Sequence, residues 1–254
     1  MHFAQNFKTV KAMVRLAILT SAVTVSTSVF AQPAGTASAA HLPLRVVLVG
    51  DSTMCNYPAS NPKRGWGMYL GEYFDTNAVT IINLAASGRS TKTFINEGRW
   101  QKALDQKPDY VLIQFGHNDS HSPDKPEATD AATDYRVYLR RYIDDARAIG
   151  AIPILVTPMV RRTFEPDGTL KDDLQRYADA MKAVGAEKNV PVIDLHASSK
   201  ALVEQQGPAK AVELADAPND ATHFNEKGAR AMAGLVMKEL PAAAPGVKQY
   251  LKNK

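Results

Sequence analysis

The chain has only one cysteine, Cys55, among its 254 residues. It therefore has no internal disulfide, and its fold depends on packing and hydrogen bonds without a covalent link. Cys55 lies three residues after Ser52, where a thiol nucleophile would be conceivable. A lone cysteine in such a place is more typical of a small buried side chain, and we predict that role for it.

Motifs of several common function classes are also missing. There is no P-loop and no Gly-x-Ser-x-Gly elbow of the α/β-hydrolase kind. Gly65-Trp66-Gly67 with Gly71 comes close to a dinucleotide fingerprint, but the spacing is wrong and no strand directly precedes it. No basic run with interleaved aromatic residues is present, so nucleic acid is not an expected partner.

The first 42 residues differ in composition from the rest. Residues 1–31 combine a basic start, a short apolar stretch and a small-residue site at Ala31, which is typical of a secretory signal peptide. A membrane anchor is disfavoured, because the apolar stretch is shorter than the roughly 20 residues of a spanning helix. Residues 32–42 are rich in Ala, Pro, Ser and Gly and indicate a disordered leader.

Removal of residues 1–31 changes the charge of the chain. This segment has no acidic residue and three basic ones, Lys8, Lys11 and Arg15. The formal net charge of +4 therefore falls by three, to +1. We expect an exported protein, periplasmic or extracellular, with no membrane attachment after signal removal and no strongly basic surface.

Five short apolar, β-branched runs follow, and none alternates between apolar and polar residues as a half-exposed strand would. They are Arg45–Val49, Val79–Leu84, Tyr110–Phe115, Ile152–Thr157 and Val190–Leu195. Helical patterns between them cover 134–143 and 170–187, and Asn225 is a suitable N-cap for a last helix. This alternation predicts one domain over 43–254, an α/β fold with a flavodoxin-like three-layer sandwich and a five-stranded parallel sheet.

Polar residues follow the first three predicted strands. Ser52 comes after the first, Gly88 after the second and Asn118 after the third. Because ligands bind beyond the carboxyl ends of parallel strands, we expect these residues at one rim of the sheet. A serine hydroxyl can act as a nucleophile, and the backbone N–H groups of Ser52 and Gly88 with the Asn118 amide can stabilise an oxyanion.

A base and its orienting carboxylate are found far downstream, as Asp220 and His223. The spacing of three allows a single turn to bring the carboxylate beside the imidazole. His223 can take the proton of Ser52, and Asp220 can fix the tautomer of the ring. Taken alone, the pair is equally consistent with a capped turn before the last helix. Together with the rim residues it indicates a serine esterase.

A metal site is an alternative to the serine esterase, because His117 and His121 flank Asp119 and could act as ligands. The zinc-protease pattern needs Glu directly after the first His, and Asn118 stands there instead. We expect no metal and no other cofactor. His196, which follows the fifth strand, is predicted to be a structural histidine.

At these residues the chain resembles the SGNH (GDSL-type) hydrolases, and most closely their rhamnogalacturonan acetylesterase branch. The motif serine is Ser52 in Gly-Asp-Ser-Thr, the motif glycine Gly88, the motif asparagine Asn118 in Gly-His-Asn-Asp, and the last block runs from Asp220 through His223. The resemblance implies a flavodoxin-like fold, no metal, and removal of acetyl groups from the sugars of a pectin backbone. Acetylated polysaccharide or oligosaccharide is then the expected partner.

Such a substrate is anionic, so cations at the rim would help to bind it. The candidates for contact with the sugar are Arg89, Lys92, Arg161 and Arg162, with Trp66 as a stacking platform. Solvated surface charge and a core tryptophan are the competing interpretations. We expect a monomer.

Three alternatives stay open. Another esterase of the same fold, acting on acetylxylan, lipid or thioester, would use the same residues. A metal-dependent phosphoesterase is suggested superficially by Gly-Asp and Gly-His-Asn-Asp, although the order of His and Asn is wrong for it. A non-catalytic glycan-binding protein is disfavoured, because every proposed catalytic position has a competent side chain.

Overall fold

A computed structural model describes residues 43–252 of the chain. The predicted signal peptide and leader lie outside the described residues. The sheet consists of β1 (Leu44–Gly50), β2 (Val79–Asn83), β3 (Tyr110–Gln114), β4 (Ile152–Val156) and β5 (Val192–Ile193). All pairings are parallel and the order is β2-β1-β3-β4-β5, so the predicted five-stranded parallel sheet is confirmed. This is the flavodoxin-like order, which places a switch point between β1 and β3.

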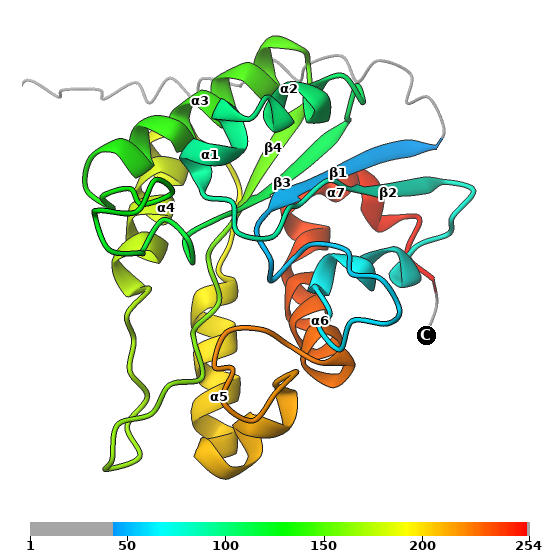
Figure 1. Cartoon of the computed structure of the whole chain (residues 1–254). Helices are drawn as coiled ribbons and strands as arrows, with labels where there is room; N and C mark the ends of the chain where they lie inside the picture. Colours follow the sequence, from blue (N-terminus) through cyan, green and yellow to red (C-terminus); the bar gives the residue numbers. More distant parts are fainter. Residues whose placement is uncertain (1–42, 253–254) are drawn as a thin grey trace, which may run out of the picture. The chain divides into compact units, whose positions relative to one another are not determined.

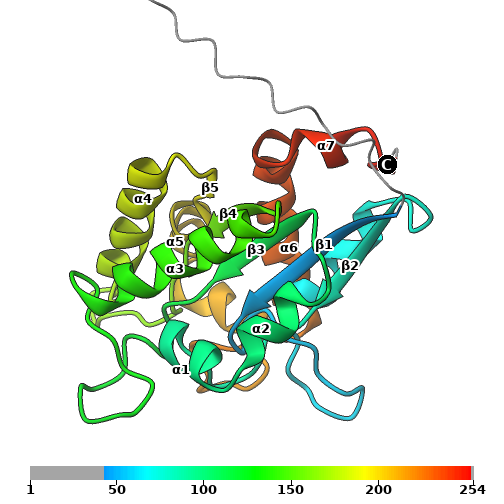
Figure 2. The same ribbon diagram turned by 90° about the horizontal axis from the view of Figure 1, so that it is seen from above.

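Helices cover both faces of the sheet (Figures 1 and 2). One face packs against α1 (Thr91–Asn96), α2 (Arg99–Leu104), α3 (Asp134–Ala148) and α4 (Gln175–Lys188). The other packs against α5 (Leu195–Ala211), α6 (Glu226–Ala243) and α7 (Pro245–Lys248). Short 3₁₀ helices at Trp66–Met68, Leu70–Tyr73 and Val212–Leu214 complete the second face. The result is the predicted three-layer α/β/α sandwich.

The two cores divide the side chains of each central strand. In β1, Val47 and Val49 face one helical layer, whereas Val46 and Leu48 face the other. All four are almost completely buried, which explains why the run is continuously apolar. The buried apolar area on both faces is the main source of stability for a fold without disulfides.

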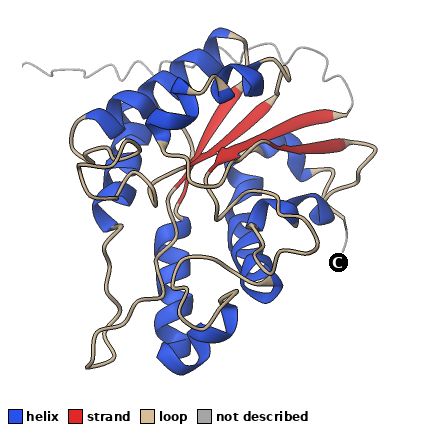
Figure 3. Ribbon diagram, in the orientation of Figure 1, coloured by secondary structure: helices blue, strands red, loops and turns tan. Residues whose placement is uncertain are grey.

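Long loops leave the carboxyl ends of β1, β2, β3 and β4, as Figure 3 shows in tan. A further loop leads to α6, which begins where Asn225 accepts a hydrogen bond from the Gly228 amide at 3.0 Å, as predicted. These loops meet at one rim of the sheet. None of the helices among residues 43–252 is both long and apolar enough to span a membrane.

Candidate active site

The loop after β1 forms a tight turn that presents Ser52. The Asp51 carbonyl accepts hydrogen bonds from the Met54 and Cys55 amides at 3.2 and 3.1 Å. The Asp51 carboxylate accepts from the Thr53 amide at 2.9 Å and from the Thr53 hydroxyl at 2.8 Å. Asp51 is fully buried and Ser52 is 5% exposed, so the turn is part of the core and only the serine reaches its surface.

A chain of buried hydrogen bonds fixes this turn to the sheet. Gln114, the last residue of β3, donates to the Thr53 hydroxyl at 2.9 Å, and the Trp66 indole donates to Gln114 at 2.6 Å. Trp66 is fully buried, so the prediction that it stacks on a sugar is wrong. Its ring lies beneath the nucleophile turn and satisfies a polar side chain there.

The two glycines beside this tryptophan have a packing role. A Cβ on Gly65 would overlap the Cys55 backbone, and one on Gly67 would come within 2.6 Å of the Met54 carbonyl. Gly65 and Gly67 thus allow two backbone segments to approach closely. This explains the motif that superficially resembled a dinucleotide fingerprint.

The structure brings the predicted nucleophile and base together across 171 positions of sequence. The distance between Ser52 Oγ and His223 Nε2 is 2.9 Å. His223 Nδ1 lies 2.7 Å from Asp220 Oδ2 on the other side of the ring. This is the geometry in which an imidazole accepts the serine proton while a carboxylate orients the ring.

Asp220 is held as an anion by its own turn. Its second oxygen accepts hydrogen bonds from the Thr222 and His223 amides, both at 2.8 Å. Partial burial would raise the pKa of Asp220, but the amides and the His223 imidazole outweigh it and hold the pKa well below its usual range. The carboxylate therefore remains charged throughout the range in which an imidazole titrates.

The predicted oxyanion donors are the backbone N–H groups of Ser52 and Gly88 and the side-chain amide of Asn118. Gly88 has a φ of +77° in the loop after β2, where a side chain would be strained. Within residues 43–252, no hydrogen bond of the structure uses the backbone N–H of Ser52 or Gly88. The Asn118 amide donates one N–H to the Arg89 carbonyl at 2.9 Å, which leaves its other N–H available. Such donors can stabilise the oxyanion of a tetrahedral intermediate.

Arg162 holds the turn that carries the base. Its guanidinium Nη2 donates to the carbonyls of Asp220 at 2.9 Å and His223 at 2.5 Å, and its amide donates to Ala221 at 2.8 Å. The side chain is 8% exposed and lies over the Phe224 ring, 4.4 Å from its centroid. Burial lowers the pKa of Arg162 to about 10. The predicted sugar-binding arginine is thus a buried support of the turn in this structure.

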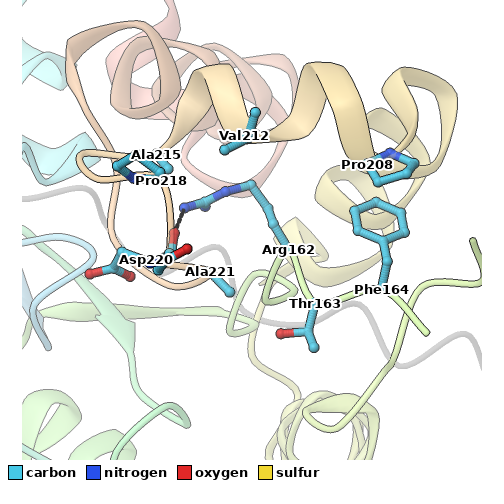
Figure 4. Close-up of a pocket in the computed structure, with 10 residues that line it drawn as sticks. Arg162, Thr163, Phe164, Pro208, Val212, Ala215, Pro218, Asp220 and Ala221 are labelled. Carbon is cyan, nitrogen blue, oxygen red and sulfur yellow. Dashed lines mark hydrogen bonds between the residues drawn. The ribbon is translucent and has the colours of Figure 1, made fainter. Parts of the chain in front are cut away.

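A pocket of about 360 Å³ adjoins the same turn. Figure 4 shows Arg162 between Asp220 and Phe164 at this pocket, with the hydrogen bond to Asp220 drawn. The remaining lining residues are Thr163, Pro208, Val212, Ala215, Pro218, Asn219 and Ala221. It is a mainly apolar space next to the orienting carboxylate.

The other predicted sugar-contacting cations are engaged elsewhere. Arg89 pairs with Glu97 at 3.0 Å, and Lys92 donates to the Ala128 carbonyl at 2.7 Å. Arg161 pairs with Asp173 at 2.7 Å and also donates to the His117 carbonyl at 2.9 Å. A contact of these residues with sugar therefore remains a prediction.

Sequence reasoning missed Lys63, whose ammonium lies 3.1 Å from His223 Nδ1 and 3.5 Å from Asp220 Oδ2. It belongs to the loop between β1 and the first 3₁₀ helix, in which no periodic pattern indicates structure. The signal that could have found it is the Lys63-Arg64 pair, placed soon after a candidate nucleophile.

The histidines considered as metal ligands have separate partners. His117 is buried with Nδ1 3.4 Å from Asp51 Oδ2, whereas His121 Nδ1 lies 2.6 Å from Glu127 Oε1. Asp119 accepts hydrogen bonds from Thr91 and Thr129. The side chains of His117, Asp119 and His121 thus belong to different networks.

One set of possible metal ligands occurs within residues 43–252, formed by Asp216, Asp220 and His223. Asp220 and His223 already use their facing atoms on each other, and the Lys63 ammonium lies beside both. A resident cation there would be repelled by the lysine and would compete with the Ser52-His223 arrangement. The donor set therefore does not fit a metal centre.

Two further predictions on single residues can be compared with the structure. Cys55 is buried, and burial raises the pKa of its thiol, as expected for a packing residue. His196 is buried with Nδ1 2.9 Å from the Pro158 carbonyl and Nε2 3.0 Å from Asp172, which is the expected structural role.

Comparison with known proteins finds relatives of this chain among ester hydrolases. The sequence pattern of the GDSL-like Lipase/Acylhydrolase family matches residues 48–231, a range that contains Ser52, Gly88, Asn118, Asp220 and His223. A probable rhamnogalacturonan acetylesterase of Bacillus subtilis (strain 168) is 42% identical over 199 residues, covering 76% of this chain and 90% of its own length. A rhamnogalacturonan acetylesterase of the same organism is 38% identical, covering 84% of this chain and 96% of its own length.

A solved structure shows the same fold. The crystal structure of the Bacillus subtilis protein YxiM superposes with a TM-score of 0.69 at 30% identity and covers 78% of this chain. The superposed region covers 56% of the length of the YxiM chain.

Proposed function

Because the chain belongs to the GDSL-like lipase/acylhydrolase family, we propose that it is a serine acetylesterase acting on carbohydrate, with acetylated rhamnogalacturonan as the substrate. The observation that carries the proposal is the continuous chain from Ser52 Oγ to His223 Nε2 at 2.9 Å and from His223 Nδ1 to Asp220 at 2.7 Å. The names of the two bacillary relatives support the choice of substrate.

The proposed reaction proceeds in two steps. Ser52 Oγ attacks the acetyl carbonyl while His223 Nε2 accepts its proton, and the oxyanion is stabilised by Ser52, Gly88 and Asn118. The intermediate collapses to acetyl-Ser52, and His223 returns the proton to the leaving sugar hydroxyl. A water molecule, deprotonated by His223, then attacks the acetyl-enzyme, and His223 returns this proton to Ser52 Oγ as acetate is released.

Acetate release tests both the chemistry and the substrate. The purified protein is given acetylated rhamnogalacturonan or acetylated xylan at equal acetyl content, and acetate is measured over time. Faster release from rhamnogalacturonan supports the proposal. Faster release from xylan would assign the enzyme to acetylxylan instead, and preference for long-chain esters would assign it to lipid.

The nucleophile is tested in the same assay. Ser52→Ala is expected to lower kcat by on the order of 10⁴-fold or more, because no other group can form the acyl-enzyme. The neighbouring Cys55→Ala serves as the matched control and should retain most of the activity, since the buried thiol contacts the Ser52 carbonyl and not the reacting hydroxyl. Wild-type rates for Ser52→Ala would remove the nucleophile assignment.

Export is part of the proposal. The basic start, apolar stretch and Ala31 site of residues 1–31 support a secretory signal peptide, and a polymeric plant substrate would be met outside the cytoplasm. N-terminal sequencing of the protein recovered from culture medium and periplasm gives the test. A mature chain starting at Gln32 is expected, whereas an intact Met1 in the exported protein would contradict it.

A further inference from the structure

Lys63 is the cation nearest to the reacting groups that the proposed mechanism leaves without a role. Its ammonium lies 3.1 Å from His223 Nδ1 and 3.5 Å from Asp220 Oδ2. Its side chain is 31% exposed, so that solvent and a sugar can reach it. The lysine is thus both in contact with the catalytic pair and open to substrate.

The backbone around Lys63 is fixed by several contacts. Arg64 pairs with Phe224 in an isolated antiparallel bridge, in which the Arg64 amide donates to the Phe224 carbonyl at 2.8 Å. Because Phe224 follows His223, this bridge sets Lys63 next to the base. The Arg64 guanidinium also binds the carbonyls of Asn61 and Lys63, and Asn61 accepts from the Lys63 amide at 2.9 Å. These contacts hold the backbone, so a change of the side-chain rotamer would move the ammonium alone.

The resting position of the ammonium is unfavourable for the reaction. An ammonium only donates hydrogen bonds, and so does the Nδ1–H of His223 in the tautomer that can accept the serine proton. Both donors therefore need Asp220 Oδ2 as their acceptor. The imidazole Nδ1 is the closer of the two, at 2.7 Å, whereas the ammonium lies at 3.5 Å. A positive charge beside the ring also opposes formation of the imidazolium during attack.

An anion on the substrate would resolve this conflict. A carboxylate that binds the ammonium provides a shorter charge-assisted hydrogen bond than the one Asp220 offers, and it draws the charge away from the imidazole. The other cations considered for this role already have partners at 3.0 Å or less, and they are Arg89, Lys92, Arg161 and Arg162. Lys63 lacks so short an ion pair.

We propose that Lys63 is a specificity residue that binds the carboxylate of a uronic-acid unit in the substrate and leaves the Asp220–His223 pair when it does so. This rests on the proposed function, since it assumes that the ester substrate is a sugar chain. The binding of an acidic sugar would then both hold the substrate and release the base for catalysis. Neutral acetylated polysaccharides would lack this second effect.

A matched pair of substrates measures the preference. Acetylated rhamnogalacturonan is compared with the same polymer after methyl esterification of its carboxyl groups, using wild type, Lys63→Met and Lys188→Met. Lys188 is the control, because it forms an ion pair with Asp144 at 2.6 Å at the end of α4, away from the carboxyl ends of the strands. Wild type and Lys188→Met should prefer the acidic polymer by about tenfold in kcat/KM, and Lys63→Met should lose that preference.

A second assay is independent of the polymer. Hydrolysis of p-nitrophenyl acetate is inhibited by added galacturonate or galactose, and inhibition constants are compared. Galacturonate should inhibit wild type about tenfold more strongly than galactose, Lys63→Arg should keep part of the difference, and Lys63→Met should abolish it. Lys63→Met should also cleave this neutral ester about twofold to fivefold faster, because the charge beside the imidazole is gone.

The outcomes separate the two proposals. If neither polymer is cleaved but galacturonate inhibition depends on Lys63, the assignment of the polymer fails and the role of Lys63 stands. If galacturonate inhibits wild type no better than galactose, or if Lys63→Met keeps the preference for acid, the role of Lys63 is overturned. A large loss of rate on p-nitrophenyl acetate in Lys63→Met that Lys63→Arg restores only in part would also overturn it, since it would mean support of the base.

Discussion

The two turns that face each other across the active site are built differently. The nucleophile turn around Ser52 belongs to the core, with Asp51 and Thr53 exposed by 1% or less. The base turn is more open, and the side chains of Asp220 and His223 are 21% and 23% exposed. The nucleophile turn is therefore as buried as the sheet beneath it, whereas the base turn is in contact with solvent.

The supports of the two turns differ as well. Gln114 joins the nucleophile turn to β3 through a neutral side chain, within the buried chain that ends at Trp66. The base turn is bound from neighbouring loops by cations, with Arg162 on its carbonyls and Lys63 beside its side chains. We infer that changes to the first turn act mainly on stability and changes to the second mainly on catalysis.

Apart from loss of the proposed nucleophile, the largest expected effect concerns Asn118, the proposed side-chain donor to the oxyanion. Asn118→Ala should lower kcat by about 10²–10³-fold with little change in KM, because the lost hydrogen bond forms only in the transition state. Asn77→Ala is the control, since this exposed asparagine precedes β2 and so lies at the amino ends of the strands, opposite the candidate site. A loss confined to KM would mean that Asn118 binds ground-state substrate.

The comparison of the turns is tested directly by removing one support from each. Arg162→Met frees the base turn and should lower kcat by up to about 10²-fold, because a small displacement of a catalytic group is costly. Gln114→Ala leaves the buried indole N–H of Trp66 without a partner and removes one of the two hydrogen bonds of the Thr53 hydroxyl, so it should lower the free energy of unfolding by about 2–4 kcal/mol. Kinetics and denaturant unfolding are measured on both variants. Equal effects of the two substitutions on kcat and on unfolding would break the distinction.

The smallest expected effect is a pH dependence of stability that comes from Asp119, a buried carboxyl group that interacts with Asp51 of the nucleophile turn. Burial raises the pKa of Asp119 to about 7, although Thr91 and Thr129 partly offset it. The folded protein therefore holds this proton where the unfolded chain has lost it, so the stabilisation is complete below about pH 4 and disappears as the pH rises through 7. The free energy of unfolding should fall by on the order of 1–3 kcal/mol between pH 4 and 8 from this group.

Denaturant titrations at several pH values check this expectation. Asp119→Asn should remove the slope, whereas Asp124→Asn, in the exposed loop nearby, should keep it. An unchanged slope in Asp119→Asn would show that another group carries the pH dependence.

Much of the fold could be predicted because parallel strands buried on both faces are recognisable as apolar runs. The first four strands end within a residue or two of the predicted positions. The fifth is shorter than the predicted Val190–Leu195, because only Val192 and Ile193 pair with β4 at this edge of the sheet. The predicted helix over 170–187 begins only at Gln175, since Leu170 pairs with Phe164 in the preceding loop.

The positions of the candidate site residues at strand ends could be predicted for a related reason. Ser52, Gly88 and Asn118 each follow a strand, and topology alone brings strand ends together. The environment of the long side chains was not predictable, because it depends on which loop covers which. Trp66 is buried and donates to Gln114, and Arg162 donates to two backbone carbonyls. Lys63 lies beside His223 because Arg64 and Phe224 form a bridge between their loops.

Cys55 gives the nucleophile turn a reporter of its own. It is the only thiol of the chain, and its sulfur lies under the turn, 3.7 Å from the Ser52 carbonyl. A thiol-directed reagent can modify it only when this turn opens. The rate of labelling in the native protein therefore measures how often this turn opens, and a tightly bound transition-state mimic should slow that rate.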